Sequence, residues 1–386
     1  MPSATTDRYM KVDFFRHNLD DACVASLVEA TKQVFISTGS KTQEFETAYA
    51  SYLGLPHAVG TMSCTHSLYL AWRALEIGAG DEVIVPAMTF VATIEALMLT
   101  GATPVFADVD PRTGILDPAS AERKITPRTK GICPVHLYGT MAPMDRFREI
   151  ADKHNLLMVE DAAHCIEGEG PGFSPGSLSD AVAFSFYATK NITCGEGGAV
   201  ATRHAKVAQK VKLLRNHGIN RSAIERFTDK VSAYDVEEYG FKSNMYDLQA
   251  ALLIPQLAAI DVNYARRAAI VQSYNNAFSG LGITLPHVPQ GHKSALHLYT
   301  VRLPGERTRD KFMVALTELG IGCTVNYRPL SSLTFFRTQL HMRGEDYPNA
   351  TAIGETTVSL PLYPNLSEAE IAHVIDSVRS IAQKIL

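Results

Sequence analysis

The feature that most constrains the fold is a series of short apolar segments between about residues 56 and 202, separated by helix-like stretches. The segments are almost continuously apolar and lack the polar alternation of a strand that has one face in water. Such strands are buried on both faces, as in parallel sheets covered by crossover helices. The pattern therefore predicts a doubly wound α/β domain. The candidate strands are residues 82–86, 103–109, 130–139, 156–162, 181–187 and 198–202.

Helix-like stretches separate most of these strands, at residues 64–78, 90–101 and 143–155. The longest apolar stretch, residues 87–107, carries a single charge at Glu95. Gly101 and Pro104 interrupt it, so it predicts a buried helix followed by a buried strand rather than a membrane span. The N-terminus has no apolar signal-peptide core, and we expect a cytoplasmic protein that does not contact a membrane.

The second half of the chain predicts a long helix and a small C-terminal α/β unit. Residues 247–278 have a helical pattern, in which Pro255 predicts a kink or local break. The polar stretch 219–240 predicts a loop. Ser367 and Glu370 have the spacing of a capping box at the start of the last helix. The other candidate elements of the C-terminal unit are strands at 297–303, 322–328 and 356–364 and a helix at 309–320.

Composition limits the domain number and the classes of partner. A chain of 386 residues is too long for one ordinary core, so we expect a large domain at 1–250 and a smaller one at 251–386. The net charge is −4, with no basic tail or stripe, which argues against a nucleic-acid partner. The six cysteines are widely spaced without a C-x-x-C pair, so we expect reduced thiols and no metal site.

Polar residues at strand ends are the first candidates for chemistry, because ligands of open parallel sheets bind beyond the carboxyl ends of the strands. Glu160 and Asp161 end one strand, where an acid either serves a ligand or caps a helix. Lys190 follows the next strand between apolar and aromatic flanks, with "GEGG" shortly after it. Burial there would lower the lysine pKa and give a neutral amine suited to Schiff-base formation. An exposed lysine in a turn is the alternative.

Further residues complete a recognisable set. The segment "TMSCTHS", residues 61–67, opens a helix whose N–H groups and hydroxyls could hold a phosphate, although ordinary capping explains it equally. Ser185 could add a hydroxyl, and Phe90 supplies an aromatic ring after another strand. A lysine, a strand-end carboxylate, a helix start and an aromatic ring are the parts of a pyridoxal phosphate site. The glycines of "GEGG" lead into a strand, so they are no dinucleotide fingerprint; we interpret them as letting the backbone pass close to a bulky ligand.

With these residues assembled, the chain resembles the DegT/DnrJ/EryC1/StrS sugar aminotransferases from about residue 12 to its end. The resemblance implies pyridoxal phosphate fold type I, with a mostly parallel seven-stranded sheet and a smaller C-terminal domain. The segments "KNITCGEGG" and "EDAAH" are most similar to the branch that aminates C4 of nucleotide-linked 4-keto sugars. The resemblance rests on "FISTGSKTQEFE", "GDEVIVPAMTFVAT", "GATPVFADVD", "ITPRTKGICPVHLYG", "VEDAAH", "SFYATKNITCGEGGAV", "RNHG" and "GFKSNMYDLQAAL".

The resemblance also implies roles at the cofactor ring. Lys190 would hold the cofactor aldehyde and move the proton during transamination, with glutamate as the amino donor. Asp161 would pair with the pyridine nitrogen, Phe90 would stack on the ring, and His164 would lie near the ring hydroxyl. Many relatives have glutamine where His164 stands. A histidine in place of Lys190 marks relatives that are dehydratases, so Lys190 indicates a transaminase.

Other implied roles concern the phosphate and the substrate. Cys64, Thr65 and Ser185 would hold the cofactor phosphate, and Asn244 would reach it from the neighbouring subunit. The active sites would then be shared in a homodimer. Weaker candidates for substrate contact are His217, Tyr327 and Arg328, for which solvated surface roles are the alternative.

Three alternative functions remain open at this stage. One is an aminotransferase acting on a C3 keto sugar or a keto-cyclitol. Another is a metal-dependent hydrolase that uses Glu160, Asp161 and His164, with Lys190 structural; few further ligands have suitable spacing for it. The last is a regulator that binds pyridoxal phosphate without turnover.

Overall fold

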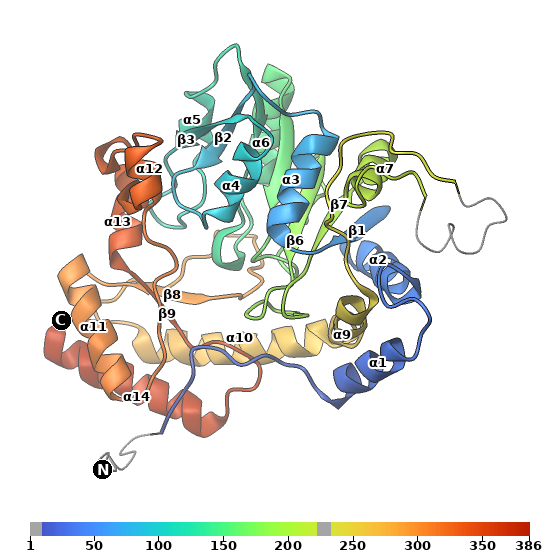
Figure 1. The fold of residues 1–386 in the computed structure, drawn as a ribbon. Coiled ribbons are helices and arrows are strands. Elements are labelled where there is room, and N and C mark those ends of the chain that lie inside the picture. Colours follow the sequence, from blue (N-terminus) through green and yellow to red (C-terminus); the bar gives the residue numbers. More distant parts are fainter. Residues whose placement is uncertain (1–9, 222–232) are drawn as a thin grey trace, which may run out of the picture.

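A seven-stranded sheet organises the larger part of the computed structural model, which describes residues 10–221 and 233–386 (Figure 1). The spatial order is β1-β7-β6-β5-β4-β2-β3, and β7 runs antiparallel to both of its neighbours while the other pairs are parallel. The predicted fold class, with its mostly parallel sheet, is thereby confirmed. The strands are β1 His57–Thr61, β2 Glu82–Pro86, β3 Thr103–Ala107, β4 Thr129–Ile132, β5 Leu157–Asp161, β6 Ala181–Ser185 and β7 Gly198–Thr202.

Two strands differ from the prediction. The strand predicted at 130–139 ends at Ile132, because Pro134 has no N–H for the ladder. The chain still follows β5 there, since the His136 N–H donates to the Asp161 carbonyl at 3.0 Å, before a 3₁₀ turn at Leu137–Gly139. Strand β1 was absent from the candidate strands, because its sequence "HAVGT" is short and only weakly apolar.

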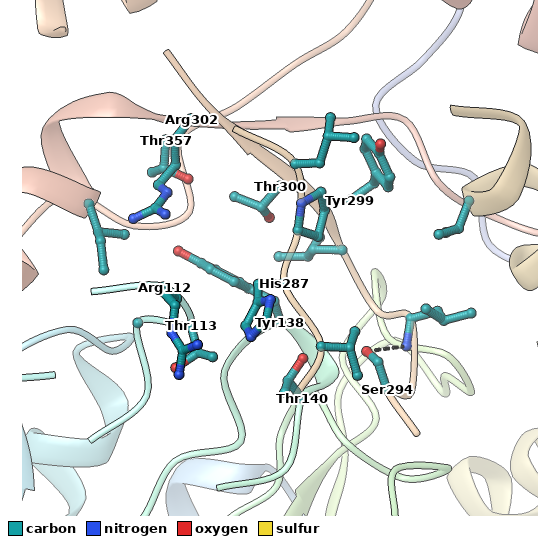
Figure 2. A pocket seen from close by; sticks show the side chains of 18 of the residues that line it. Arg112, Thr113, Tyr138, Thr140, His287, Ser294, Tyr299, Thr300, Arg302 and Thr357 are labelled. Carbon is teal, nitrogen blue, oxygen red and sulfur yellow. Dashed lines mark hydrogen bonds between the residues drawn. The ribbon is translucent and has the colours of Figure 1, made fainter. Parts of the chain in front are cut away.

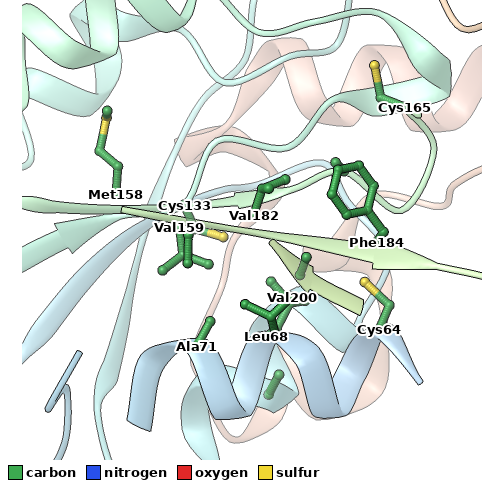
Figure 3. Close-up of a cluster of buried hydrophobic side chains, with 14 of the residues drawn as sticks. Cys64, Leu68, Ala71, Cys133, Met158, Val159, Cys165, Val182, Phe184 and Val200 are labelled. Carbon is green, nitrogen blue, oxygen red and sulfur yellow. The ribbon is translucent and has the colours of Figure 1, made fainter. Parts of the chain in front are cut away.

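Helices cover both faces of the sheet. Residues alternate between the faces along β5 and β6, so Val159, Asp161 and Ala183 point to one side and Phe184 to the other. Figure 3 shows α3 lying under the first of these faces, with Leu68 among the apolar side chains beneath the strands. On the other face, the ring of Phe184 packs edge-on against Tyr49 of α2, with centroids 5.2 Å apart. The helices of this part are α1 Asp21–Thr31, α2 Ser40–Leu53, α3 Cys64–Ala74, α4 Ala92–Met98, α5 Pro118–Glu122, α6 Met144–His154 and α7 Ala205–Leu214.

The predicted long helix consists of two helices, α9 Asp247–Ala258 and α10 Ile260–Phe278. The break falls at Ala259, one turn after Pro255. A proline inside a helix removes the hydrogen bond of its missing N–H and crowds the carbonyl four residues earlier, yet α9 continues past Pro255 to Ala258. Part of the loop predicted at 219–240 lies outside the described residues.

The C-terminal elements form a second hydrophobic core around the antiparallel pair β8 Tyr299–Arg302 and β9 Thr357–Leu360. The strand expected at 322–328 is reduced to one bridge, between Thr324 and Ser359. The capping box of Ser367 and Glu370 is confirmed. The division into two domains at residue 250 stays a prediction. Ile353, from the C-terminal part, packs in the core of the large sheet. The remaining helices are α11 Glu306–Glu318, α12 Thr334–Thr338, α13 Pro348–Thr356 and α14 Glu368–Ile385, with 3₁₀ turns at Leu330–Ser332 and Gly344–Asp346.

The apolar stretch 87–107 forms α4 followed by β3, as its two interrupting residues predicted. Among the helices of the described ranges, none combines the length and the apolar character needed to cross a bilayer.

Candidate active site

Asp161 is the last residue of β5 and turns its carboxylate toward α4. One carboxylate oxygen accepts a hydrogen bond from the Thr93 hydroxyl at 2.7 Å, and the other accepts one from the Ala163 N–H at 3.1 Å. The Thr93 hydroxyl lies 2.8 Å from that of Thr89. A carboxylate can accept about four hydrogen bonds. Asp161 is therefore buried and held in place, yet each of its oxygens keeps capacity for a ligand.

Glu160 points to the opposite face of the sheet. His136 accepts a hydrogen bond from the Ala142 N–H at Nδ1, so neutral His136 donates from Nε2 to the Glu160 carboxylate, 2.7 Å away. The Gly176 N–H also donates to this carboxylate, at 3.0 Å. Glu160 and Asp161 therefore do not converge, which contradicts the arrangement that the hydrolase alternative needs. In the parts of the chain that the structure describes, no group of three His, Cys, Asp or Glu side chains is placed to bind a metal ion.

Lys190 lies in the turn after β6, where its backbone N–H donates to the Tyr187 carbonyl at 2.9 Å. Its amine has no hydrogen-bond or ion-pair partner within residues 10–221 and 233–386. The Lys190 side chain is partly buried. Desolvation of its amine lowers the pKa to about 8, although the neighbouring Cys64 and Asp161 act in the opposite direction. Near neutral pH a useful fraction of the amine is thus uncharged and nucleophilic. The predicted desolvated lysine lies beside the predicted carboxylate.

His164 has a defined tautomer. The Tyr138 backbone N–H donates to Nδ1 at 3.2 Å, so a neutral ring carries its proton on Nε2, which lies 3.1 Å from the Tyr327 hydroxyl. Burial, and secondarily Lys190, lowers the pKa of His164 well below its usual value, so the ring is neutral. The ring of Phe90 is 5.4 Å from that of Tyr327 and is 52% exposed, which leaves it free to stack on a ligand. The structure therefore brings Tyr327, a weak candidate, next to two strong ones.

The start of α3 has unused N–H groups. Ser63 caps the helix by accepting from the His66 N–H at 3.2 Å, whereas the N–H groups of Cys64 and Thr65 have no partner among the described residues. Such groups favour an anion. The Cys64 side chain packs into the hydrophobic core, so its backbone is what faces a ligand. Ser185 ends β6 and accepts from the Tyr187 N–H at 3.3 Å.

Gly198 explains part of the glycine cluster. In β7 it pairs with Ser185, and a Cβ on Gly198 would lie 2.4 Å from the Ser63 carbonyl carbon and 2.6 Å from the Cys64 nitrogen. Only glycine lets β7 pass so close to the start of α3. Contrary to the expectation from "GEGG", this glycine serves the contact between strand and helix rather than the approach of a ligand.

The side chains of three predicted residues make no contact with this cluster, although the Asn244 backbone bridges Thr61 shortly before α3. The Asn244 side chain donates to the Thr38 hydroxyl at 2.6 Å, while its buried oxygen has no partner. His217 and Arg328 are exposed and make no side-chain hydrogen bond or ion pair with the described chain. Asn244 reaching a neighbouring subunit, and substrate contact by the other two, stay predictions.

Sequence reasoning missed the residues that anchor the loop after Lys190. The Asn191 amide donates to the buried Glu167 carboxylate at 2.8 Å, and Glu167 forms an ion pair with buried Arg267 of α10. The Asn191 oxygen lies 3.3 Å from Nδ1 of His297, whose ring is 4.4 Å from that of His164. The spacing of these residues along the chain gives no signal, because more than one hundred positions separate Asn191 from His297.

Comparisons with known proteins agree with this geometry. Residues 18–379 match the model of the DegT/DnrJ/EryC1/StrS aminotransferase family. The chain is 39% identical over 366 residues to the spore coat polysaccharide biosynthesis protein SpsC of Bacillus subtilis, covering 93% of this chain and 94% of SpsC.

Two solved structures are similar in fold. Spr1654 from Streptococcus pneumoniae, described as a sugar aminotransferase in PMP-form, has a TM-score of 0.92 and 31% identity, covering 97% of this chain and 100% of its own. A PLP-form of Spr1654 is similar as well. DesV of S. venezuelae, in complex with a ketimine intermediate, has a TM-score of 0.87 and 36% identity, covering 94% of each chain. The similarity thus extends over nearly the whole chain.

Proposed function

The chain belongs to the DegT/DnrJ/EryC1/StrS aminotransferase family, and we propose that it transfers the amino group of glutamate to C4 of a nucleotide-linked 4-keto sugar. That the chain is a pyridoxal phosphate-dependent transaminase acting on sugars follows from the family and from its structural neighbours. The donor, the ring position and the nucleotide are the proposal. The observation that supports a nucleotide-linked substrate is the excess of basic side chains in the cavity beside Asn244, whereas the Lys190 amine near the Asp161 carboxylate supports the transamination chemistry.

The residues of the site fit pyridoxal phosphate. When bound, this cofactor supplies an aldehyde that combines with amines and a ring that accepts electrons. In the proposal, the free acceptor capacity of Asp161 serves the ring nitrogen, and the unpaired N–H groups of Cys64 and Thr65 serve the phosphate. The exposed face of Phe90 is available to the ring. The Ser185 hydroxyl ends the strand beside the start of α3 and would add a contact to the phosphate.

Lys190 has two tasks in the reaction that we propose. With the cofactor bound, its uncharged Nζ would hold the aldehyde carbon, with loss of water. Once the amino donor has replaced it there, the freed Nζ would be the group that moves a proton between the donor's α-carbon and the cofactor. A pKa of about 8 suits both tasks, because the protonated and neutral forms are both populated near neutral pH. His164 contributes an uncharged N–H at Nε2, oriented by the Tyr138 backbone.

The cavity beside Asn244 supports a nucleotide-linked substrate. It has a volume of about 700 Å³ and contains more basic than acidic side chains. Arg215 is buried in an ion pair with Glu46, and Lys210 pairs with Glu238. If Asn244 reaches the site of a neighbouring subunit in a homodimer, the remaining excess of positive charge lies beside that site and favours an anionic diphosphate. A cytoplasmic location is part of the same prediction. The basic lining residues are Lys206, Lys210, Lys212, Arg215, Arg221 and Lys242, and the acidic ones are Glu46 and Glu237.

The decisive experiment separates the donor half of the reaction from the acceptor half. The purified protein loaded with pyridoxal phosphate should be yellow, and borohydride should fix the cofactor to the peptide that contains Lys190. Glutamate should then bleach the colour, and aspartate or alanine should do so far more slowly. Persistent colour with every amino donor would indicate a binder without turnover.

The acceptor is then identified by mass. The bleached protein is mixed with a panel of nucleotide-linked 4-keto sugars, each paired with the same sugar lacking the nucleotide. We expect a product only with the linked sugar, together with the return of the yellow colour. Amination of a C3 keto sugar or a keto-cyclitol, but of no 4-keto sugar, would replace the proposal with the corresponding alternative.

A further inference from the structure

We propose that the cavity between the large sheet and the C-terminal elements is a second ligand site, which binds a small oxyanion. The cavity has a volume of about 80 Å³ and is separate from the residues assigned to the cofactor. Figure 2 shows its polar side chains, contributed by the loop after β3, the segment around Tyr138 and the strands β8 and β9. The inference goes beyond the proposed function and does not depend on it.

The lining of the cavity carries positive charge that is only partly compensated. Arg112 and Arg302 both line it, and none of the described lining residues is an aspartate or glutamate, although Asp110 just outside the lining pairs with Arg112 and acts on the charge of Arg302. Arg302 donates a hydrogen bond to the Pro111 carbonyl but forms no ion pair with any described carboxylate. Burial lowers the pKa of Arg302, as expected for a cation without a partner in a partly dry position. The closest carboxylate to Arg112 is that of Asp110, at 3.8 Å.

A buried hydroxyl in the wall makes no hydrogen bond of ordinary geometry. Thr357 is fully buried, and its Oγ1 has no such bond within the described chain, although it lies near enough to the Tyr138 hydroxyl to act on the pKa of that group. Such groups are rare in folded proteins because burial without a hydrogen bond is unfavourable. Thr357 of β9 lies directly opposite Arg302 of β8 in the antiparallel register, so both side chains are on the same face. An anion between them would accept hydrogen bonds from a guanidinium and from the unpaired hydroxyl.

The size of the cavity selects the class of ligand. One water molecule needs about 10–15 Å³ of such volume, so the cavity holds roughly five to eight atoms of this size. Inorganic phosphate or a short carboxylate therefore fits, and a nucleotide does not.

Tyr138 separates this cavity from the candidate active site. It lines the cavity, its backbone N–H donates to His164, and its hydroxyl donates to the carbonyl of Asn326, the neighbour of Tyr327. An anion in the cavity would therefore hold a residue that orients His164 and contacts the backbone next to Tyr327.

Inorganic phosphate is the first probe, and malonate is the second, to distinguish a phosphate from a carboxylate site. The protein is used loaded with pyridoxal phosphate, so that the start of α3 is already occupied. We expect calorimetry to show saturable binding of at least one of the two anions. At ten times its Kd, the bound anion should raise Tm by about 2 °C.

Two variants locate the site. Thr357→Val keeps the shape and removes a hydroxyl that makes no hydrogen bond of ordinary geometry, so it should fold about as well as the wild type. It should weaken anion binding about tenfold, because it removes a hydrogen bond to a charged group. Arg302→Met should weaken binding about thirtyfold or more. The control is Arg146→Met, which removes an exposed cation of α6 that pairs with Glu149, and should leave the Kd unchanged.

The outcome is decided by Thr357→Val even if Arg302→Met fails to fold. Unchanged binding of both anions to Thr357→Val would place the anion elsewhere and overturn the proposal. If neither anion binds saturably to the wild type, the proposal is also overturned, and the cavity holds only water.

Discussion

Asp161 and Asp247 are both buried aspartates, but their surroundings differ. Asp161 accepts two hydrogen bonds at the end of β5. Asp247, the first residue of α9, accepts four from the start of α2. A carboxylate whose acceptor sites are all filled by the fold has no site left for a ligand. A carboxylate with unfilled acceptor sites can still bind one. Counting hydrogen bonds thus separates a structural acid from a functional one when both are equally buried.

The four partners of Asp247 show its task. The N–H groups of Gly39, Lys41 and Thr42 donate to its carboxylate at 2.7, 3.2 and 3.0 Å, and the Thr42 hydroxyl donates at 2.6 Å. Gly39 is the N-cap residue of α2 and provides no side chain for the purpose. Asp247 therefore supplies the cap from about two hundred residues away and ties α9 to α2.

The largest effect is expected at Lys190, on the functional side of this comparison. Lys190→Met removes the amine that holds the cofactor and moves the proton, so transamination should fall at least a thousandfold, as is typical of losing a combined nucleophile and acid–base group (~10³ or more). Stability without cofactor should not fall, because the buried amine has its pKa lowered and its charge is unfavourable in the folded state. Single-turnover bleaching and thermal unfolding measure the two quantities. Activity within tenfold of the wild type would remove Lys190 from the reaction.

Asp161→Asn comes next. The amide keeps an acceptor for the Thr93 hydroxyl but loses the negative charge and the bond from the Ala163 N–H, so the free energy of unfolding should fall by about 1 kcal/mol. Transamination should fall about a hundredfold, the order expected when the charge that favours a protonated ring nitrogen is lost. The rate of bleaching by glutamate and urea unfolding provide the measurements. A stability loss as large as that of Asp247→Asn would mean that Asp161 is structural.

Asp247→Asn is the matched variant on the structural side. In the wild type the four donors bond to two charged oxygens, whereas the amide has only one neutral oxygen. The free energy of unfolding should therefore fall by about 2–4 kcal/mol. The folded fraction should react at the wild-type rate. A variant that keeps the wild-type urea midpoint but loses turnover would contradict the structural role of Asp247.

The smallest effect concerns the pH dependence of stability. The pKa of His164 is well below the ordinary value of 6.5, because the ring is buried. Below about pH 6.5 the unfolded chain binds a proton that the folded ring does not, so stability falls as the pH decreases. His164→Gln removes this contribution and should lose less stability between about pH 7.5 and 5.5. His297, whose pKa is lowered in the same way, should retain part of the dependence in the variant. If the urea midpoints of the wild type and of His164→Gln, both free of cofactor, change equally with pH, His164 is protonated in the folded state.

Local patterns in the sequence predicted much of the fold and several site residues. Continuous apolar runs identified strands such as β2, and the spacing of Ser367 and Glu370 identified a helix start. Position after a strand identified Asp161 and Lys190, because the ends of parallel strands meet at one edge of a sheet. These inferences succeed because they depend on neighbours within a few residues.

What only the tertiary structure decided involves partners that are distant along the chain. The acceptor counts of Asp161 and Asp247, the anchoring of Asn191 by Glu167 and His297, and the unpaired hydroxyl of Thr357 all depend on segments that meet only after folding. Hydrogen bonding and burial act over a few ångströms in space, whatever the separation in sequence. The sequence by itself therefore determined which groups were available for chemistry, and packing decided which of them kept free capacity to perform it.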